Sequence, residues 1–216
     1  MKILTILTGK IIPVEFRGKP IPTGFFKHPV PGPVMLRSLT LEGDEQADLR
    51  VHGGADKALY AYPYDSYDAW RRFKPGIDFQ PGAFGENLCM SSLDEKEICL
   101  GDTFELGDAV IQVTQPRYPC FKLGIKFNDQ AMVQDFDRFG RPGVYFRVLR
   151  EGLIAVGDEM KLVKREAVLV PVQEIFEMTE LDPLRIEEIL QVESLTEKMR
   201  NKYQSFLDSQ SAMVPE

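Results

Sequence analysis

The 216-residue sequence is poor in histidine and cysteine, the side chains that most often hold transition metals directly. It contains His28, His52, Cys89, Cys99 and Cys120 and no others of either type. The cysteines form neither a Cys-x-x-Cys pair nor a zinc-type quartet, so a closed structural zinc site is not expected. A disulfide scaffold is also not expected for a domain of this size in a reducing compartment. We expect Cys89 and Cys99 to be small buried apolar residues.

Long hydrophobic runs and blocks of positive charge are also missing. No apolar run approaches the roughly 18–20 residues that a membrane span requires. The short apolar N-terminus lacks the small-residue cleavage site of a secretory signal. The net charge is −7, from 26 Lys and Arg against 33 Asp and Glu. These features predict a cytoplasmic protein that binds neither membranes nor nucleic acid.

The first 165 residues have the pattern of a β-rich domain. Alternation and β-branched residues predict strands over 3–12, 34–39, 58–62, 110–114 and 144–149. Two pairs, Gly101-Asp102 and Gly157-Asp158, each predict a turn that leads into a half-buried strand. Helical spacing predicts short helices over 64–73 and 129–139. Strands and short helices in this irregular order favour an α+β fold with a mixed β-barrel over a parallel doubly wound sheet.

Past residue 166 the strand signals stop and helical periodicity begins. It predicts helices over 172–178, 183–191 and 196–207, and Asp182 before Pro183 is a good N-cap with proline at the first helical position. Helices this short are marginal alone and must pack on each other or on the barrel. We therefore predict a β-barrel domain over residues 1–165 and a small helical extension over residues 166–216.

Cys120 is the cysteine best placed for chemistry. A predicted strand ends near Thr114, and Pro119 favours the first helical position, which predicts Cys120 in the first turn of a helix. There the helix dipole, together with Arg117 and Lys122, would favour a thiolate, the form that binds metals or acts as a nucleophile. A buried cysteine beside a strand end is the alternative interpretation, and spacing alone leaves it open.

Residues 48–57 form a second candidate site. The adjacent Gly53 and Gly54 would let backbone N–H groups approach a ligand closely, and Arg50, His52 and Lys57 would surround them with donors. Such a loop can hold a phosphate. It matches neither the P-loop nor the dinucleotide fingerprint. A β-turn with solvated charges is the alternative interpretation.

Two further loops carry polar residues. Residues 81–88 include Asn87, which would contact a ligand if it faced inward and would belong to an ordinary turn if it faced outward. Residues 23–30 include Lys27 and Thr23, either of which could meet an anion, although a solvated loop is the alternative. A serine hydrolase is poorly supported, because the sequence has no Gly-x-Ser-x-Gly elbow.

Together these segments resemble the MOSC domain family, named for the C-terminal domain of molybdenum cofactor sulfurase. Order and spacing are similar over roughly residues 1–163. The motifs are Gly43-Asp44-Glu45-Gln46-Ala47-Asp48, His52-Gly53-Gly54-Ala55-Asp56-Lys57, Phe84-Gly85-Glu86-Asn87-Leu88, Gly101-Asp102 and Pro116-Arg117-Tyr118-Pro119-Cys120-Phe121-Lys122-Leu123. The lysine-bearing early loop and the helical tail are similar to the stand-alone bacterial YiiM branch, whose members carry a three-helix C-terminal extension.

The resemblance implies a β-rich MOSC-type mixed β-barrel that binds a mononuclear molybdenum–pyranopterin cofactor, with Cys120 as the metal ligand. A soft thiolate suits a metal already held by dithiolene sulfurs, and an anionic cofactor phosphate needs a cationic cradle. Cofactor contacts are expected at Lys27, Arg50, His52, Gly53, Gly54, Lys57, Asn87, Arg117 and Cys120. Cys120, His52 and Asp56 are the expected catalytic residues, the last two as candidate proton donors.

The YiiM-type resemblance further implies an oxidoreductase that reduces small N-hydroxylated compounds such as 6-hydroxylaminopurine. Nothing in the sequence looks like a flavin, haem or iron–sulfur site, so the electrons are expected from a separate reductase, such as a flavoprotein. Two other functions stay open. One is a carrier of the molybdenum cofactor without turnover. The other is a sulfur carrier in which Cys120 holds a persulfide and no metal.

Overall fold

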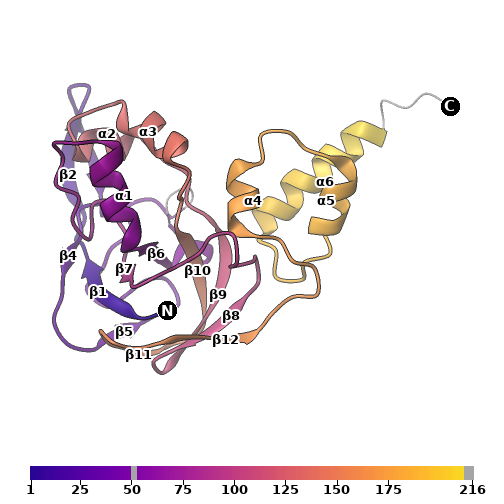
Figure 1. Ribbon diagram of the computed structural model, residues 1–216, viewed down its shortest axis with the longest axis horizontal. Helices are drawn as coiled ribbons and strands as arrows, with labels where there is room; N and C mark the ends of the chain where they lie inside the picture. Colours follow the sequence, from indigo (N-terminus) through magenta and orange to yellow (C-terminus); the bar gives the residue numbers. More distant parts are fainter. Residues whose placement is uncertain (50–52, 212–216) are drawn as a thin grey trace.

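The computed structural model describes residues 1–49 and 53–211. Strands and short helices alternate irregularly along the first three quarters of the chain, and helices follow the last strand (Figure 1). The strands are β1 (Ile3–Thr8), β2 (Ile12–Phe16), β3 (Lys19–Thr23), β4 (His28–Pro29), β5 (Val34–Leu36), β6 (Leu59–Pro63), β7 (Leu88–Met90), β8 (Thr103–Leu106), β9 (Ala109–Pro116), β10 (Val144–Arg150), β11 (Gly152–Ile154) and β12 (Met160–Lys164). The helices are η1 (Ala55–Lys57, a 3-10 helix), α1 (Asp65–Phe73), α2 (Phe121–Lys126), α3 (Met132–Phe139), α4 (Val172–Glu177), α5 (Pro183–Ile189) and α6 (Glu197–Ser211).

Eight strands form the main sheet, in the order β12-β8-β9-β10-β6-β7-β1-β4. Neighbours pair antiparallel except β6 and β7, which are parallel. The start of β1 also meets the entry to β12. There the Ile3 N–H donates to the carbonyl of Asp158 (3.0 Å), and the Met160 N–H donates to that of Met1 (2.9 Å). These bonds curl the sheet back on itself, and the fold is α+β and sheet-rich, as predicted.

Strand β6 shows how the core is divided. Side chains alternate across a strand, so Leu59 and Ala61 enter a large aliphatic cluster while Tyr60 and Tyr62 enter an aromatic one. All of β6 is buried, because both of its faces are covered. The aromatic cluster centres on Trp70 and fixes α1 and α3 beside the sheet. The face of β6 that carries Tyr60 and Tyr62 is therefore fixed in place beneath the loops of the candidate site.

Several local predictions are confirmed. The pairs Gly101-Asp102 and Gly157-Asp158 lead into β8 and β12, and these two strands pair with each other. Cys89 and Cys99 are buried, at 0 % and 3 % exposure, and burial raises the pKa of both thiols. Asp182 caps α5 by accepting a hydrogen bond from the Leu184 N–H (3.1 Å). Turn chemistry and capping are local, which is why the sequence shows them.

The predicted strand over 3–12 is wrong in its length. It breaks after Thr8, and β2 and β3 form a separate hairpin. The break has a physical cause at Gly9, whose N–H donates to a carboxylate oxygen of Asp44 (2.7 Å). A Cβ at this position would lie 2.6 Å from the carbonyl oxygen of Phe26. Only glycine fits so close to a neighbouring backbone.

Helices α4, α5 and α6 lie together on one side of the sheet (Figure 1). They do not form a separate core. Ile186, Ile189 and Tyr203 belong to the same buried cluster as Ile111 and Phe146 of the sheet. Within residues 1–49 and 53–211 no helix combines the length and the apolar character needed to cross a bilayer.

Candidate functional site

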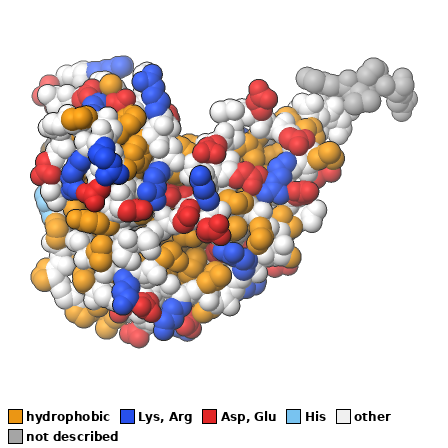
Figure 2. All heavy atoms as spheres, in the orientation of Figure 1, with side chains coloured by type: hydrophobic (Ala, Val, Ile, Leu, Met, Phe, Trp, Pro, Cys, Tyr) orange, Lys and Arg blue, Asp and Glu red, His pale blue; other side chains and the backbone are white. Residues whose placement is uncertain are grey.

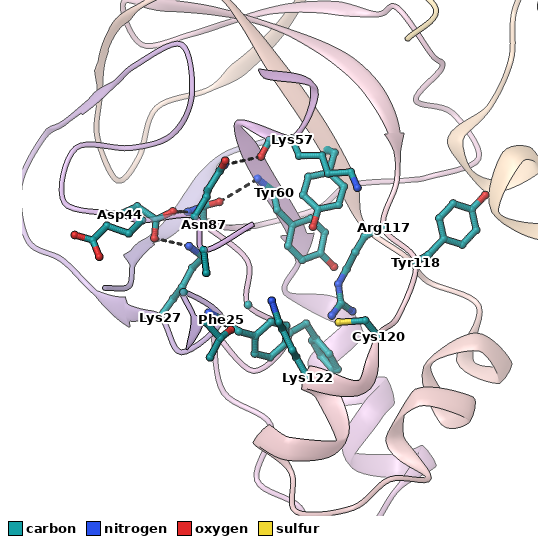
Figure 3. Close-up of a pocket in the computed structure, with 18 residues that line it drawn as sticks. Phe25, Lys27, Asp44, Lys57, Tyr60, Asn87, Arg117, Tyr118, Cys120 and Lys122 are labelled. Carbon is teal, nitrogen blue, oxygen red and sulfur yellow. Dashed lines mark hydrogen bonds and ion pairs between the residues drawn. The ribbon is translucent and has the colours of Figure 1, made fainter. Parts of the chain in front are cut away.

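A narrow cavity of about 90 Å³ lies above the aromatic side of the sheet (Figure 3). That is the space of roughly three water molecules, enough for a phosphate-sized group. Loops before β4, after β5, before β7 and after β9 surround it. Its lining residues are Thr23, Gly24, Phe25, Lys27, Asp44, Glu45, Gln46, Ala47, Lys57, Tyr60, Phe84, Gly85, Asn87, Arg117, Tyr118, Cys120, Lys122 and Tyr145. We call it the inner cavity.

Arg117 is a buried cation with unused hydrogen-bonding capacity. It follows β9 directly and is only 3 % exposed. Its guanidinium lies 4.6 Å from the ring centroid of Phe136 and 5.6 Å from those of Phe25 and Tyr60. No hydrogen-bond partner for its Nη1 atom is found among the described residues. A buried charged donor left in this state is costly, which indicates that the site is built to receive an acceptor, most simply an anion.

Cys120 lies at the N-cap of α2, with extended backbone angles (φ −141°, ψ 168°). The prediction that it lies in the first helical turn is wrong by one position, because Pro119 stays outside the helix. The carbonyl of Cys120 accepts the Leu123 N–H (3.0 Å), which starts the turn. The residue is partly exposed. Its sulfur and the Arg117 guanidinium both point into the inner cavity (Figure 3).

A buried hydrogen-bond network shapes the other wall. The carboxylate of Asp44 pairs with the ammonium of Lys27, and their side chains are 1 % and 8 % exposed. Asn87 donates to Asp44 Oδ2 (2.9 Å), and its Oδ1 accepts the Tyr60 N–H (3.2 Å). Burial lowers the pKa of Lys27, and the charge of Asp44 opposes this shift. Lys27 and Asn87 therefore tie loops together in this structure, in addition to lining the cavity.

The inner cavity has an excess of positive charge. Among the described residues, four cations, Lys27, Lys57, Arg117 and Lys122, line it against two carboxylates. One carboxylate is committed to Lys27, as described above, and the other, Glu45, accepts from the exposed Lys10 (3.1 Å). Lys122 is 8 % exposed. The balance favours an anionic ligand.

The structure brings together several of the residues predicted from the sequence: Lys27, Lys57, Asn87, Arg117 and Cys120. Others do not line the cavity. The Gly54 N–H donates to Gln46 Oε1 (2.8 Å), and Gly53 stands beside it. The carboxylate of Asp56 pairs with Arg147 (2.9 Å). Arg50 and His52 lie outside the described residues. The roles assigned to these five positions stay predictions.

Gln46, Tyr60 and Tyr145 are among the lining residues that were not singled out from the sequence. Gln46 donates to the carbonyl of Lys57 (3.0 Å) and accepts from Gly54, so it holds the turn before η1. Tyr60 and Tyr145 face each other across β6 and β10, with ring centroids 5.0 Å apart. Burial raises the pKa of Tyr145, and the charge of Arg117 opposes the shift. A periodic strand pattern marks these tyrosines as buried and gives no sign of a cavity.

The donor set fits a cofactor that brings most of its own metal ligands. Within the described residues, no group of three or more His, Cys, Asp and Glu side chains could hold a metal ion together. One partly exposed thiol and an unsatisfied buried guanidinium are present instead. Thiolates bind soft metals, and guanidinium binds phosphate. The residues therefore fit an anionic molecule whose metal needs one protein thiolate.

A family model and two relatives of known sequence match this chain. Residues 48–161 match the MOSC domain family. The chain is 39 % identical over 216 residues to the uncharacterized protein YflK of Bacillus subtilis (99 % of this chain, 96 % of that one). It is 41 % identical over 162 residues to the protein YiiM of Escherichia coli (74 % and 71 %).

Two further matches are a relative that is named as a reductase and a solved crystal structure. A protein named reductase from Gibberella moniliformis is 35 % identical over 166 residues, which is 76 % of this chain and 29 % of that longer protein. The crystal structure of YiiM from Geobacillus stearothermophilus matches with a TM-score of 0.78 and 31 % identity, over 95 % of this chain and 98 % of that one. This likeness extends through the C-terminal helices.

Proposed function

Because this chain belongs to the MOSC domain family, we propose that it is a cytoplasmic oxidoreductase that binds a molybdenum–pyranopterin cofactor whose phosphate occupies the inner cavity. Its substrates are small N-hydroxylated compounds such as 6-hydroxylaminopurine. The naming of one relative as a reductase supports the reaction class. The chemistry of the inner cavity supports the cofactor.

The observation that carries the proposal is the buried Arg117 beside the partly exposed Cys120. Arg117 presents an unsatisfied Nη1 donor within the described part of the chain, and Lys122 adds a second buried cation. These two residues would hold the anionic phosphate, and the Cys120 thiolate would complete the ligand set of the metal. A structural role alone would not explain a guanidinium kept buried with a donor unsatisfied.

The protein's part in the reaction is positioning and charge compensation. Reduction of a hydroxylamine takes up two electrons and two protons, breaks the N–O bond, forms an N–H bond of the amine and releases water. When bound, the cofactor supplies the electrons for this step. The electrons are replaced by a separate reductase, expected to be a flavoprotein. Asp56 and His52 stay the predicted proton donors, with a bound water as the alternative.

The test is metal and pterin analysis of full-length protein made in a host that synthesises the cofactor. We expect near-stoichiometric molybdenum in the wild type and its loss in Cys120→Ala. Cys99→Ala is the matched control. It removes a buried thiol that does not line the inner cavity, so the variant should keep its molybdenum. Reduced viologen dye then serves as the electron donor in an assay with 6-hydroxylaminopurine.

The outcomes separate the alternatives. Molybdenum and pterin without turnover of any N-hydroxylated compound would indicate a cofactor carrier. Protein with neither metal nor pterin, and with the mass of one extra sulfur on Cys120, would indicate a persulfide carrier. Either result contradicts the proposed reductase.

A further inference from the structure

A second cavity lies beside the inner one, between the sheet and the C-terminal helices. Its volume is about 570 Å³, within the range of roughly 300–1,000 Å³ typical of small-molecule sites. Figure 2 shows the molecular surface hollowed between these two parts. Lys57, Tyr118, Cys120 and Tyr145 line both cavities. A molecule in this outer cavity would therefore lie against the proposed metal ligand.

The outer cavity is basic. Lys57 of η1 and Lys198 and Lys202 of α6 line it, and none of its described lining residues is acidic. This contrasts with the net charge of −7 for the chain. Lys198 and Lys202 lie four positions apart on one helix face, where like charges weaken a helix. Burial lowers the pKa of Lys57 and the charge of Lys198 lowers it further, while the charges of Asp48, Cys120 and Asp56 oppose the shift. An anion bound between the three lysines would relieve the repulsion.

Apart from Gln115, the rest of the described wall is apolar and aromatic. Tyr118 stacks on Phe176 with ring centroids 5.6 Å apart, and it is 54 % exposed. Its hydroxyl donates to the carbonyl of Ile175 (2.8 Å), which holds the ring in place. Met199 and Tyr203 line the cavity from α6. Flat heteroaromatic rings pack well on side chains of this kind.

We propose that the substrates of this site are planar N-hydroxylated heterocycles that also carry an anionic group, as a purine nucleotide does. Lys198 and Lys202 hold the anionic group, while the ring packs on Tyr118 with its N–O bond toward Cys120. The inference rests on the proposed reductase function and adds a preference for the charged form of the substrate. The free base would engage only the aromatic wall.

The test compares three substrates with the cofactor-loaded, full-length protein and reduced viologen: 6-hydroxylaminopurine, its ribonucleoside and its 5′-monophosphate. We expect the lowest KM for the monophosphate. The double variant K198Q/K202Q should raise that KM by about tenfold or more, because two charge-assisted contacts are lost, and leave the KM for the free base unchanged. The matched control K161Q/K164Q removes two exposed lysines of β12. Binding of inosine 5′-monophosphate, measured by calorimetry, gives a readout that needs no turnover.

Two results would overturn the inference. One is equal KM values for base and monophosphate, with the double variant and its control behaving alike. The other is a loss of pterin in K198Q/K202Q, which would assign the lysines to the cofactor. Absence of turnover with all three substrates, alongside inosine monophosphate binding that depends on Lys198 and Lys202, would instead overturn the reductase function and support the anion subsite.

Discussion

Replacing Asp44 by Asn removes the counter-charge of a buried lysine. The carboxylate accepts hydrogen bonds from the Gly9 N–H (2.7 Å), the Thr40 hydroxyl (2.7 Å) and the Asn87 amide (2.9 Å), and it pairs with Lys27. Both charged side chains are almost completely buried. The substitution keeps the shape of the side chain and leaves the ammonium without its partner.

D44N should lower the free energy of unfolding by a large amount for a single isosteric substitution. Breaking a buried ion pair by removing one partner typically costs about 3–5 kcal/mol. We expect D44N to lower the free energy of unfolding at pH 7 by about 3 kcal/mol, near the lower end, because Asn can keep part of the hydrogen bonding and Lys27 can lose its proton. The free energy of unfolding of a whole protein is only about 5–15 kcal/mol, so a loss of this size should be readily measured.

The pH dependence of the stability of D44N tests whether the unpaired charge of Lys27 causes the loss. Burial already lowers the pKa of Lys27 below its usual value, and without Asp44 the pKa falls further. The folded variant then binds fewer protons than the unfolded chain, so its stability rises with pH until the unfolded lysine also titrates, near about pH 10.4. The difference in stability between D44N and wild type should therefore shrink from pH 7 to pH 9.

Urea denaturation at pH 7, 8 and 9 measures both effects. Lys10→Met is the matched control, since it breaks the neighbouring pair with Glu45, whose side chains are 66 % and 40 % exposed, and should cost less than about 1 kcal/mol. Adding Lys27→Met to D44N should recover much of the loss. The reasoning is refuted if D44N costs no more than the control, or if its cost does not change with pH.

Three other predictions concern the site and the helices. Arg117→Met should lower pterin retention by about tenfold or more while leaving the melting temperature of cofactor-free protein unchanged or higher, because methionine removes an unsatisfied buried charge; a clear drop in melting temperature would indicate a structural role instead. Iodoacetamide should label Cys120 of cofactor-free protein before Cys89 and Cys99, whose burial raises their thiol pKa; equal labelling by peptide mass spectrometry would contradict this exposure order. Truncation after residue 165 removes Ile186, Ile189 and Tyr203 from the shared core, and at about 1.5–3 kcal/mol per large apolar side chain it should abolish cooperative unfolding followed by circular dichroism; a truncated chain that melts like the full-length protein would show that residues 1–165 fold independently.

Local chemistry in the sequence determined much of the secondary structure. The alternation over 144–149 became β10, the Asp182 cap began α5, and the two Gly-Asp turns led into β8 and β12. The motif around Cys120 indicated the family, and the comparisons confirm that membership. These features depend on residues close together in the chain, where spacing and turn geometry act directly.

Only the tertiary structure decided which of these residues meet. The contact of Asp44 with Gly9 ends β1, and the Asn87 side chain links that carboxylate to β6. Likewise, residues 198–203 of α6 and residues 115–120, at the end of β9 and just after it, line the outer cavity together. Such contacts depend on how the curled sheet and the helices pack over long sequence separations. No local pattern carries that information, because the same periodicity is compatible with many arrangements of the elements.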